Sequence, residues 1–133
     1  MSYLLDTNVC IRFINGYSQP ILEKLRSIPA DDIFVCSVVK GEMFFGSQKS
    51  NNPERSLSVQ RKFLSSFQSL PFDDHAAEYF GEIRAYLTRQ GNLIGPYDIQ
   101  IAAIALANDC TLVTHNVREF GRIANLEIED WEG

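Results

Sequence analysis

The chain has 133 residues, of which 45% are hydrophobic and 22% are charged, and this composition excludes an intrinsically disordered protein. The length fits one domain, residues 1–133, with a hydrophobic core of its own. The formal net charge of −5 argues against binding nucleic acid through overall charge, because phosphate contacts need lysine and arginine.

In the first part of the chain, short apolar runs alternate with segments of helical periodicity. Residues 3–5 are predicted to form a buried strand, and residues 8–15 a helix that Gly16 ends. Residues 20–28 place apolar side chains on one helical face, and residues 33–36 are rich in strand-forming side chains. The predicted order is therefore strand, helix, helix, strand.

The middle of the chain is predicted to be mostly helical. Residues 37–46 form a helix that opens with a serine suited to the N-cap position, and residues 53–68 form another that begins with proline. Residues 70–72 are a brief strand whose proline places it at the edge of a sheet. Residues 74–90 then have the apolar spacing of a long helix.

The last part of the chain contains its most apolar helix. Residues 98–108 are apolar almost all round, which predicts a central helix covered by other elements. A strand at residues 111–114, a short helix containing Phe120 and a last strand at residues 126–128 follow. The whole order predicts an α/β domain with a short, mostly parallel sheet flanked by helices, whose ligands bind at the carboxyl ends of the strands.

The three cysteines, Cys10, Cys36 and Cys110, are odd in number and widely spaced, so neither a disulfide framework nor a zinc site is predicted. We expect buried, reduced thiols. No apolar run nears the roughly 20 residues of a transmembrane helix. The amino-terminal segment also lacks the features of a signal peptide, so the expected location is the cytoplasm, away from membranes.

Acidic side chains stand at or just beyond three apolar segments, where a chain usually avoids charge. They are Asp6, Glu42 and Asp98. Carboxylates gathered at one edge of a sheet repel each other unless a cation neutralises them. Mg²⁺ or Mn²⁺ is the natural cation for a site made only of oxygen ligands. This pattern therefore predicts a divalent metal site of the kind that nucleases use.

Each of these positions also has a structural interpretation. Asp6 and Asp98 could cap the helices that follow them, and Glu42 could be a solvated surface group. Glu42 shares a helical face with apolar neighbours, however, which favours a functional role. The polar segment after residue 113 adds Asn116 and Glu119, either of which could support a metal through water.

The motifs together resemble those of PIN-domain ribonucleases, in particular the VapC-type toxins of bacterial toxin–antitoxin pairs. They are residues 5–8 (LDTN), residues 37–46 around the glutamate, residues 94–98 (IGPYD) and residues 112–120 (LVTHNVREF). The tail at residues 128–131 fits a subset of that family. The resemblance covers essentially the whole chain and implies a parallel sheet flanked by helices and metal-dependent endonucleolytic cleavage of RNA.

The resemblance also implies roles for the acidic residues. Asp6 and Asp98 would hold Mg²⁺ or Mn²⁺, and Glu42 would ligate through water or orient the attacking water. The family often has an aspartate after the last core strand, where this chain has Asn116 with Glu119 three residues on. Either of the two could complete the site. The alternatives to this function are an inactive PIN-like RNA-binding module and a metal-dependent phosphohydrolase.

Partners follow from the same resemblance. It implies an RNA substrate, with the anticodon region of transfer RNA as the expected target, together with a homodimer and a cognate VapB-type antitoxin. An aromatic patch at Phe13, Tyr17, Phe44 and Phe45 would suit an inserted antitoxin segment. That segment should bring an arginine or lysine to the carboxylates.

A few basic side chains near the predicted site must contact the RNA phosphates, since the net charge provides no general attraction. The candidates are Arg12, Lys40, Lys49 and Arg118.

Overall fold

The computed structural model describes residues 1–16 and 18–133, and within these residues five short strands form one sheet. Every neighbouring pair of strands is parallel. The strands, in their order across the sheet, are β3 (Gln68–Leu70), β2 (Ile33–Cys36), β1 (Tyr3–Leu5), β4 (Thr111–Val113) and β5 (Ile128–Glu129). The predicted α/β fold is confirmed, and the sheet is parallel throughout.

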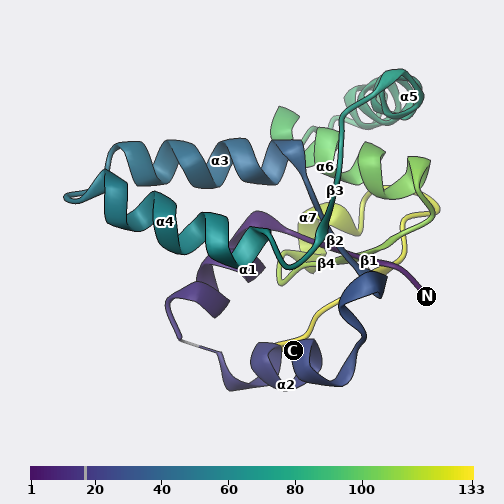
Figure 1. Cartoon of the computed structure of the whole chain (residues 1–133). Coiled ribbons are helices and arrows are strands. Elements are labelled where there is room, and N and C mark those ends of the chain that lie inside the picture. Colours follow the sequence, from purple (N-terminus) through teal and green to yellow (C-terminus); the bar gives the residue numbers. More distant parts are fainter. Residues whose placement is uncertain (17) are drawn as a thin grey trace.

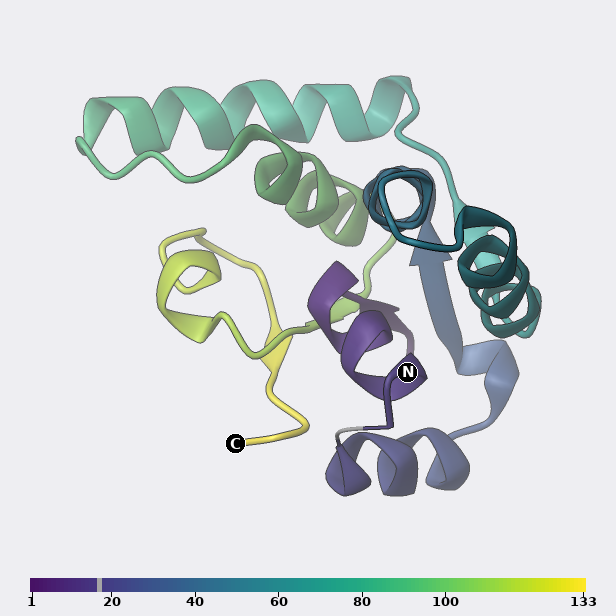
Figure 2. The ribbon, with the colours of Figure 1, turned by 90° about the vertical axis from the view of Figure 1, so that its left-hand side faces the viewer.

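Helices surround this sheet. They are α1 (Thr7–Ile14), α2 (Gln19–Ser27), α3 (Ser37–Gln48), α4 (Pro53–Leu64), α5 (Asp74–Arg89), α6 (Pro96–Ala107) and α7 (Val117–Phe120), with a 3-10 turn at Ala30–Asp32. Helices α3 and α4 pack as an antiparallel pair that projects away from the sheet (Figure 1). Helix α5 lies across α6 on the opposite side of the molecule from α2 (Figure 2). No helix among the described residues is long and apolar enough to span a membrane.

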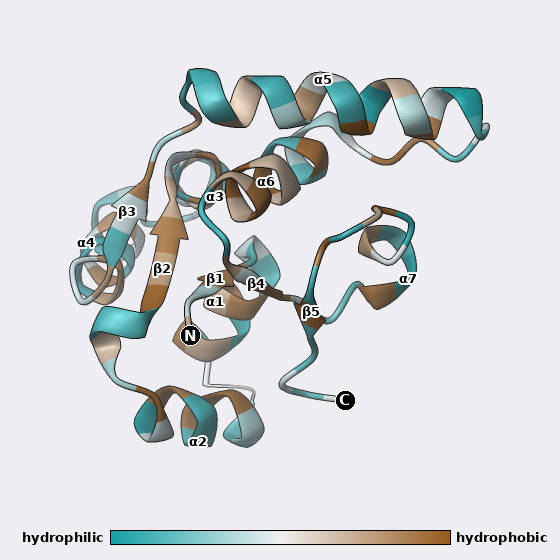
Figure 3. Cartoon of the chain, turned by 90° about the vertical axis from the view of Figure 1, so that its right-hand side faces the viewer, coloured by the Kyte–Doolittle hydropathy of each residue, from teal (hydrophilic) through white to brown (hydrophobic). Residues whose placement is uncertain are grey.

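Helix α6 is the centre of the hydrophobic core, as its sequence predicts. Ile99, Ile101 and Ile104 are at most 1% exposed, and so are the neighbouring alanines Ala102, Ala103 and Ala105. The helix shows apolar residues over most of its surface, between α5 and the sheet (Figure 3). Neighbours cover its middle, from Ile99 to Ala105, and this packing fixes the position of the helix beside the sheet.

The structure corrects two predicted boundaries around β3. Helix α4 ends at Leu64, four residues before the predicted end, and β3 occupies Gln68–Leu70 and not residues 70–72. Pro71 has no backbone N–H to donate to a neighbouring strand, so β3 ends before it. β3 is an edge strand, as the proline predicts.

The predicted burial of the cysteines is confirmed, since Cys10, Cys36 and Cys110 are all buried, each with a free thiol. The pKa of Cys36 is raised to about 11, mainly by burial and also by the charges of Asp6 and Glu42, against the opposing effect of two backbone hydrogen bonds. Burial likewise raises the pKa of Cys10. These thiols stay protonated at neutral pH and do not supply a nucleophile.

The core position of α6 predicts a large stability loss on truncation. Ile101→Ala should lower the free energy of unfolding by about 2–5 kcal/mol, because a fully buried side chain leaves a cavity. Chemical denaturation of the purified protein measures this. Val59→Ala is the matched control, since Val59 is 45% exposed, and it should change stability by no more than about 0.5 kcal/mol. Equal effects of the two changes would contradict a central α6.

Candidate active site

The candidate site lies where the strand order changes direction. From β1 the chain continues to β2 on one side, whereas β4 on the other side of β1 continues to β5. The carboxyl ends of such adjacent strands border a crevice, which is the usual ligand site of an open parallel sheet. Asp6 follows β1 and Thr114 follows β4 at this crevice.

Asp6 is the most constrained side chain of the site. It is 5% exposed and caps α1 by accepting a hydrogen bond from the Thr7 N–H at 2.7 Å through Oδ1. Its Oδ2 accepts a hydrogen bond from the Thr114 hydroxyl at 2.8 Å. Burial raises the pKa of Asp6, the two hydrogen bonds oppose the rise, and the charge of Glu42 adds to it. The capping and functional interpretations of Asp6 are therefore compatible.

Glu42 is half-buried in the middle of α3, and a threonine orients it. The Thr7 hydroxyl donates to Glu42 Oε1 at 2.7 Å. Thr7 thus connects two acidic residues, because its backbone N–H binds Asp6 and its side chain binds Glu42. Glu42 is not a free surface group, and its second carboxylate oxygen remains open to other ligands.

Asp98 lies in the first turn of α6 and not at the N-cap, which is Gly95. Pro96 starts the helix two residues earlier than predicted, since proline suits the first helical position. Burial, together with the charges of Asp6, Glu42 and Glu119, raises the pKa of Asp98 to about 6. Asp98 therefore shares one electrostatic environment with all three other carboxylates.

Of the residues after β4, Glu119 acts on the acidic cluster, whereas Asn116 and His115 make other contacts. Glu119, in α7, is one of the charges that act on Asp98. Asn116 is the N-cap of α7, and its backbone N–H donates to the Thr114 hydroxyl at 3.0 Å. His115 is exposed and binds Asp130 at 3.0 Å through Nδ1, so it pairs with the carboxy-terminal segment.

Sequence reasoning did not identify the two threonines. Thr114 is fully buried and links the backbone of Asn116 to the carboxylate of Asp6. Thr7 joins Asp6 to Glu42. No spacing or composition distinguishes a threonine with this role from an ordinary one at a strand end. The only available signal was their position directly beside Asp6 and directly after an apolar strand.

The donor set suits a hard divalent cation, because it consists of carboxylate oxygens in partly buried surroundings that raise the pKa of Asp6 and Asp98. Asp6, Asp98, Glu42 and Glu119 are the residues that could hold it. In the part of the chain that the structure describes, no three acidic, histidine or cysteine side chains already stand around a common point.

The predicted phosphate contacts occupy different surroundings. Arg12 donates from Nε to Glu132 Oε2 at 2.8 Å, which ties α1 to the carboxy-terminal segment. The Lys49 ammonium lies 4.9 Å from the centre of the Phe45 ring. Lys40 is half-buried on α3, and Arg118 is exposed on α7. The acid-rich surroundings of Arg12 make it the candidate least available to RNA.

The predicted aromatic patch is only partly exposed. Phe45 is 66% exposed, whereas Phe44 and Phe13 are half-buried. The Phe13 ring packs 5.2 Å from the ring of Phe63 on α4. Tyr17 lies outside the described residues. Among the described members of the patch, Phe45 offers the most surface to a ligand.

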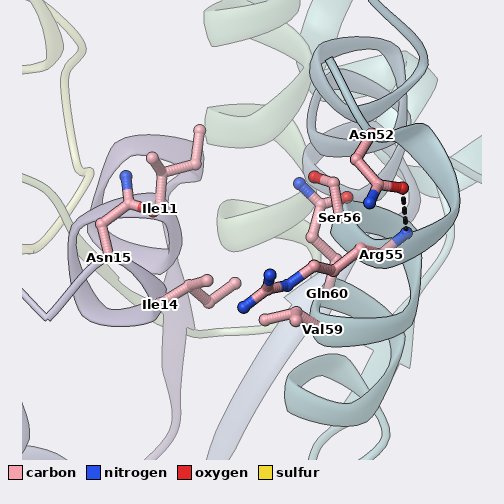
Figure 4. Close-up of a pocket in the computed structure, with 8 residues that line it drawn as sticks. All are labelled: Ile11, Ile14, Asn15, Asn52, Arg55, Ser56, Val59 and Gln60. Atoms are coloured by element: carbon pink, nitrogen blue, oxygen red, sulfur yellow. Dashed lines mark hydrogen bonds between the residues drawn. The ribbon is translucent and has the colours of Figure 1, made fainter. Parts of the chain in front are cut away.

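Apart from the crevice at the sheet edge, a groove of about 320 Å³ lies between α1 and α4 (Figure 4). Ile11 and Ile14 of α1 face Arg55 and Val59 of α4 across it. The Arg55 backbone N–H donates to the Asn52 side chain at 3.2 Å, which caps α4. None of the acidic residues line this groove, so it is separate from the candidate active site.

Comparison with known proteins agrees with the fold. The PIN domain family matches residues 3–126. The tRNA(fMet)-specific endonuclease VapC of Salmonella typhimurium is 39% identical over 98% of each chain. Ribonuclease VapC2 of Rickettsia felis is 37% identical over 99% of each chain. The crystal structure of DNA-bound VapBC from Salmonella typhimurium contains a chain that superposes with a TM-score of 0.93 over 98% of both chains, at 39% identity.

The chain belongs to the PIN-domain family. Its likeness to VapC proteins over nearly their whole length places it, within that family, among the VapC ribonucleases. The resemblance found in the motifs is thereby confirmed.

The raised pKa of Asp98 predicts a change of stability with pH. Its folded value of about 6 lies above the ordinary 3.8, so the folded state binds the proton more tightly. Stability from this group is therefore lost as pH rises from about 4 to about 6. In metal-free buffer at pH 7, Asp98→Asn should raise the free energy of unfolding by about 1–2 kcal/mol, after allowance for solvent screening.

Denaturation of the Asp98→Asn variant in EDTA at a series of pH values measures this gain, which should disappear below about pH 4. Asp74→Asn is the matched control, because Asp74 is exposed in the first turn of α5. Its removal should slightly lower stability through the lost helix-dipole interaction. A gain for Asp98→Asn that does not depend on pH would contradict the electrostatic cause.

Proposed function

We propose that this chain is the ribonuclease toxin of a toxin–antitoxin pair and that it hydrolyses RNA phosphodiester bonds with Mg²⁺ or Mn²⁺. The observation that carries this proposal is the acidic cluster at the crevice between β1 and β4. There Asp6 is fixed by two hydrogen bonds and Asp98 shares its surroundings with three other carboxylates. The VapC relatives, each a ribonuclease or endonuclease by name, support this chemistry.

The residues of the chain have separate roles in this reaction. Asp6 and Asp98 would hold the divalent cation, which when bound lowers the pKa of water and stabilises the charge on the leaving oxygen. Thr114 keeps Asp6 in one orientation through its 2.8 Å hydrogen bond. Glu42 has one oxygen occupied by Thr7, and its other oxygen can orient the attacking water or accept its proton.

The reaction needs no covalent intermediate with the protein. Cys10 and Cys36, the cysteines nearest the acids, are buried and have raised pKa values. His115 is paired with Asp130 and does not activate a neighbouring nucleophile. Water is therefore the nucleophile, and the protein positions it and neutralises charge.

We infer that the substrate is transfer RNA and that initiator tRNA is the first one to test. The support is the Salmonella relative, which is described as tRNA(fMet)-specific and is 39% identical over nearly the full length of both chains. The acidic residues act at the phosphodiester bond that is cut and do not recognise a base. They are Asp6, Glu42 and Asp98. Selection of one RNA must come from surfaces beside the acids.

We also infer a cognate antitoxin and a homodimer. The related structures from Salmonella typhimurium and Rickettsia felis are VapBC complexes by title. A partner segment carrying arginine or lysine would neutralise Asp6, Glu42 and Asp98 by charge-assisted hydrogen bonds and displace a metal from them. Such a contact blocks cleavage by occupying the carboxylates.

Cleavage should depend on both the metal and Asp6. EDTA should abolish RNA cleavage, Mg²⁺ or Mn²⁺ should restore it, and Asp6→Asn should abolish it with the fold intact. Asparagine is also a good N-cap, because its Oδ1 can still accept the hydrogen bond of the Thr7 N–H, while its Nδ2 can donate to the Thr114 hydroxyl. Gel analysis of tRNA cleavage and thermal unfolding test the two parts, with Asp74→Asn as control. Undiminished cleavage in EDTA would refute the metal mechanism, and metal binding without cleavage would indicate an inactive RNA-binding module.

The fourth acidic position can be assigned by comparing two variants. Glu119→Gln should reduce cleavage about 10- to 100-fold, because it removes a charge that acts on Asp98. Asn116→Ala should have a smaller effect, since Asn116 contacts Thr114 through its backbone N–H, which alanine retains. Single-turnover cleavage rates at saturating Mg²⁺ distinguish the two. If both variants match the parent, the site consists of Asp6, Glu42 and Asp98 alone.

A further inference from the structure

A groove of about 580 Å³ opens between α3 and α6 directly beside the acidic cluster. It is lined by Val38, Gly41, Glu42, Phe45, Tyr97 and Gln100. Glu42 belongs to both the groove and the candidate active site. Tyr97 immediately precedes Asp98 on α6. A ligand in this groove therefore continues directly into the acidic cluster.

Two exposed aromatic rings flank the groove. Phe45 is 66% exposed and Tyr97 is 58% exposed. Phe45 follows Glu42 by three residues on α3, so both lie on the same helical face. At Gly41, which also lines the groove, an added Cβ would meet no described atom within 4 Å, which leaves room for a flat group. Exposed aromatic rings beside an active site indicate a binding surface.

The charge around the groove favours a polyanion. Residues 37–64, which contain α3 and α4, have five basic residues against two acidic ones, a net charge of +3. The remainder of the chain has a net charge of −8. Lys49 lies 4.9 Å from the Phe45 ring, and the Arg61 guanidinium lies 6.0 Å from the Phe44 ring. Basic groups interleaved with aromatic rings are the usual composition of a surface for single-stranded nucleic acid.

We propose that Phe45 and Tyr97 form a stacking platform for an unpaired base of the RNA substrate, next to the phosphate that is cut. Lys49 contacts a neighbouring phosphate. Beyond this contact, the RNA strand runs along the other basic residues of the α3–α4 pair, away from the acidic cluster. This proposal rests on the proposed function for its substrate class. It explains how a chain of net charge −5 binds RNA. The basic residues of α3 and α4 are gathered where the RNA strand extends away from the acidic cluster.

Binding can be measured apart from cleavage in the Asp6→Asn background. The probe is a fluorescent single-stranded RNA of about eight nucleotides, a length within the range that such surfaces cover. Phe45→Ala and Tyr97→Ala should each raise Kd roughly 5- to 100-fold, since each removes a stacked ring. Phe45→Trp and Tyr97→Phe should keep the affinity near that of the parent. Tyr86→Ala is the control, because Tyr86 is also exposed, at 43%, but lies on α5 and does not line the groove.

A modified RNA identifies the stacked nucleotide. Each base of the RNA is replaced in turn by an abasic ribose. For the protein that retains both rings, one position in the RNA should show a much larger loss of affinity than the others. At that position the modification should add little to the loss already caused by Phe45→Ala, because both remove the same contact. Lys49→Gln should reduce the salt dependence of binding by about one phosphate contact.

The outcomes separate this proposal from the proposed function. If the parent fails to cleave RNA but binding still depends on both rings, the proposed function fails and the platform stands. Unchanged RNA affinity in folded Phe45→Ala and Tyr97→Ala proteins overturns the platform. If those variants instead lose affinity for the antitoxin or change oligomeric state with RNA affinity unchanged, the groove belongs to a protein partner and the platform is again overturned.

Discussion

Repulsion among carboxylates at one edge of the sheet is the constraint on which the site depends. The pKa of Asp98 rises to about 6 through burial and through the charges of Asp6, Glu42 and Glu119. Hydrogen bonds from Thr114 and Thr7 offset part of the cost by stabilising the charged form of Asp6. What remains is an attraction for a cation that an ordinary protein surface lacks. The repulsion among the carboxylates that weakens the metal-free fold is also the source of the affinity of the site for a cation.

The rest of the fold holds these charges in place. Strand β1 lies in the middle of the sheet and pairs with both β2 and β4, so Asp6 begins from a buried, doubly paired strand. Asp98 sits in the first turn of α6, whose middle, from Ile99 to Ala105, is packed into the core. Glu42 is fixed by a hydroxyl from α1. Rigid elements therefore keep the carboxylates close against their repulsion, as an effective catalytic site requires.

The positions of the three main acids were predictable because a carboxylate at the end of an apolar run is visible in sequence. The central place of α6 was predictable for the same reason, since its composition leaves no polar face. The roles of Thr7 and Thr114 were not, because a hydroxyl donor has no pattern of its own. The start of β3 was missed because its first two residues are exposed and polar. The pairing of Arg12 joins residues 120 positions apart, a separation at which local pattern carries no information.

The hydrogen bond from Thr114 to Asp6 joins residues 108 positions apart, and the one from Thr7 to Glu42 spans 35 positions. Closing chain segments of such length is entropically costly and slow compared with forming local helices. The acidic cluster therefore depends on the assembled sheet, whereas α1 and α3 are local elements that can form without it. A chain that ends before β4 would keep Asp6, Thr7 and Glu42 but would lack the Thr114 hydroxyl that binds Asp6, so the site needs nearly the full length of the domain.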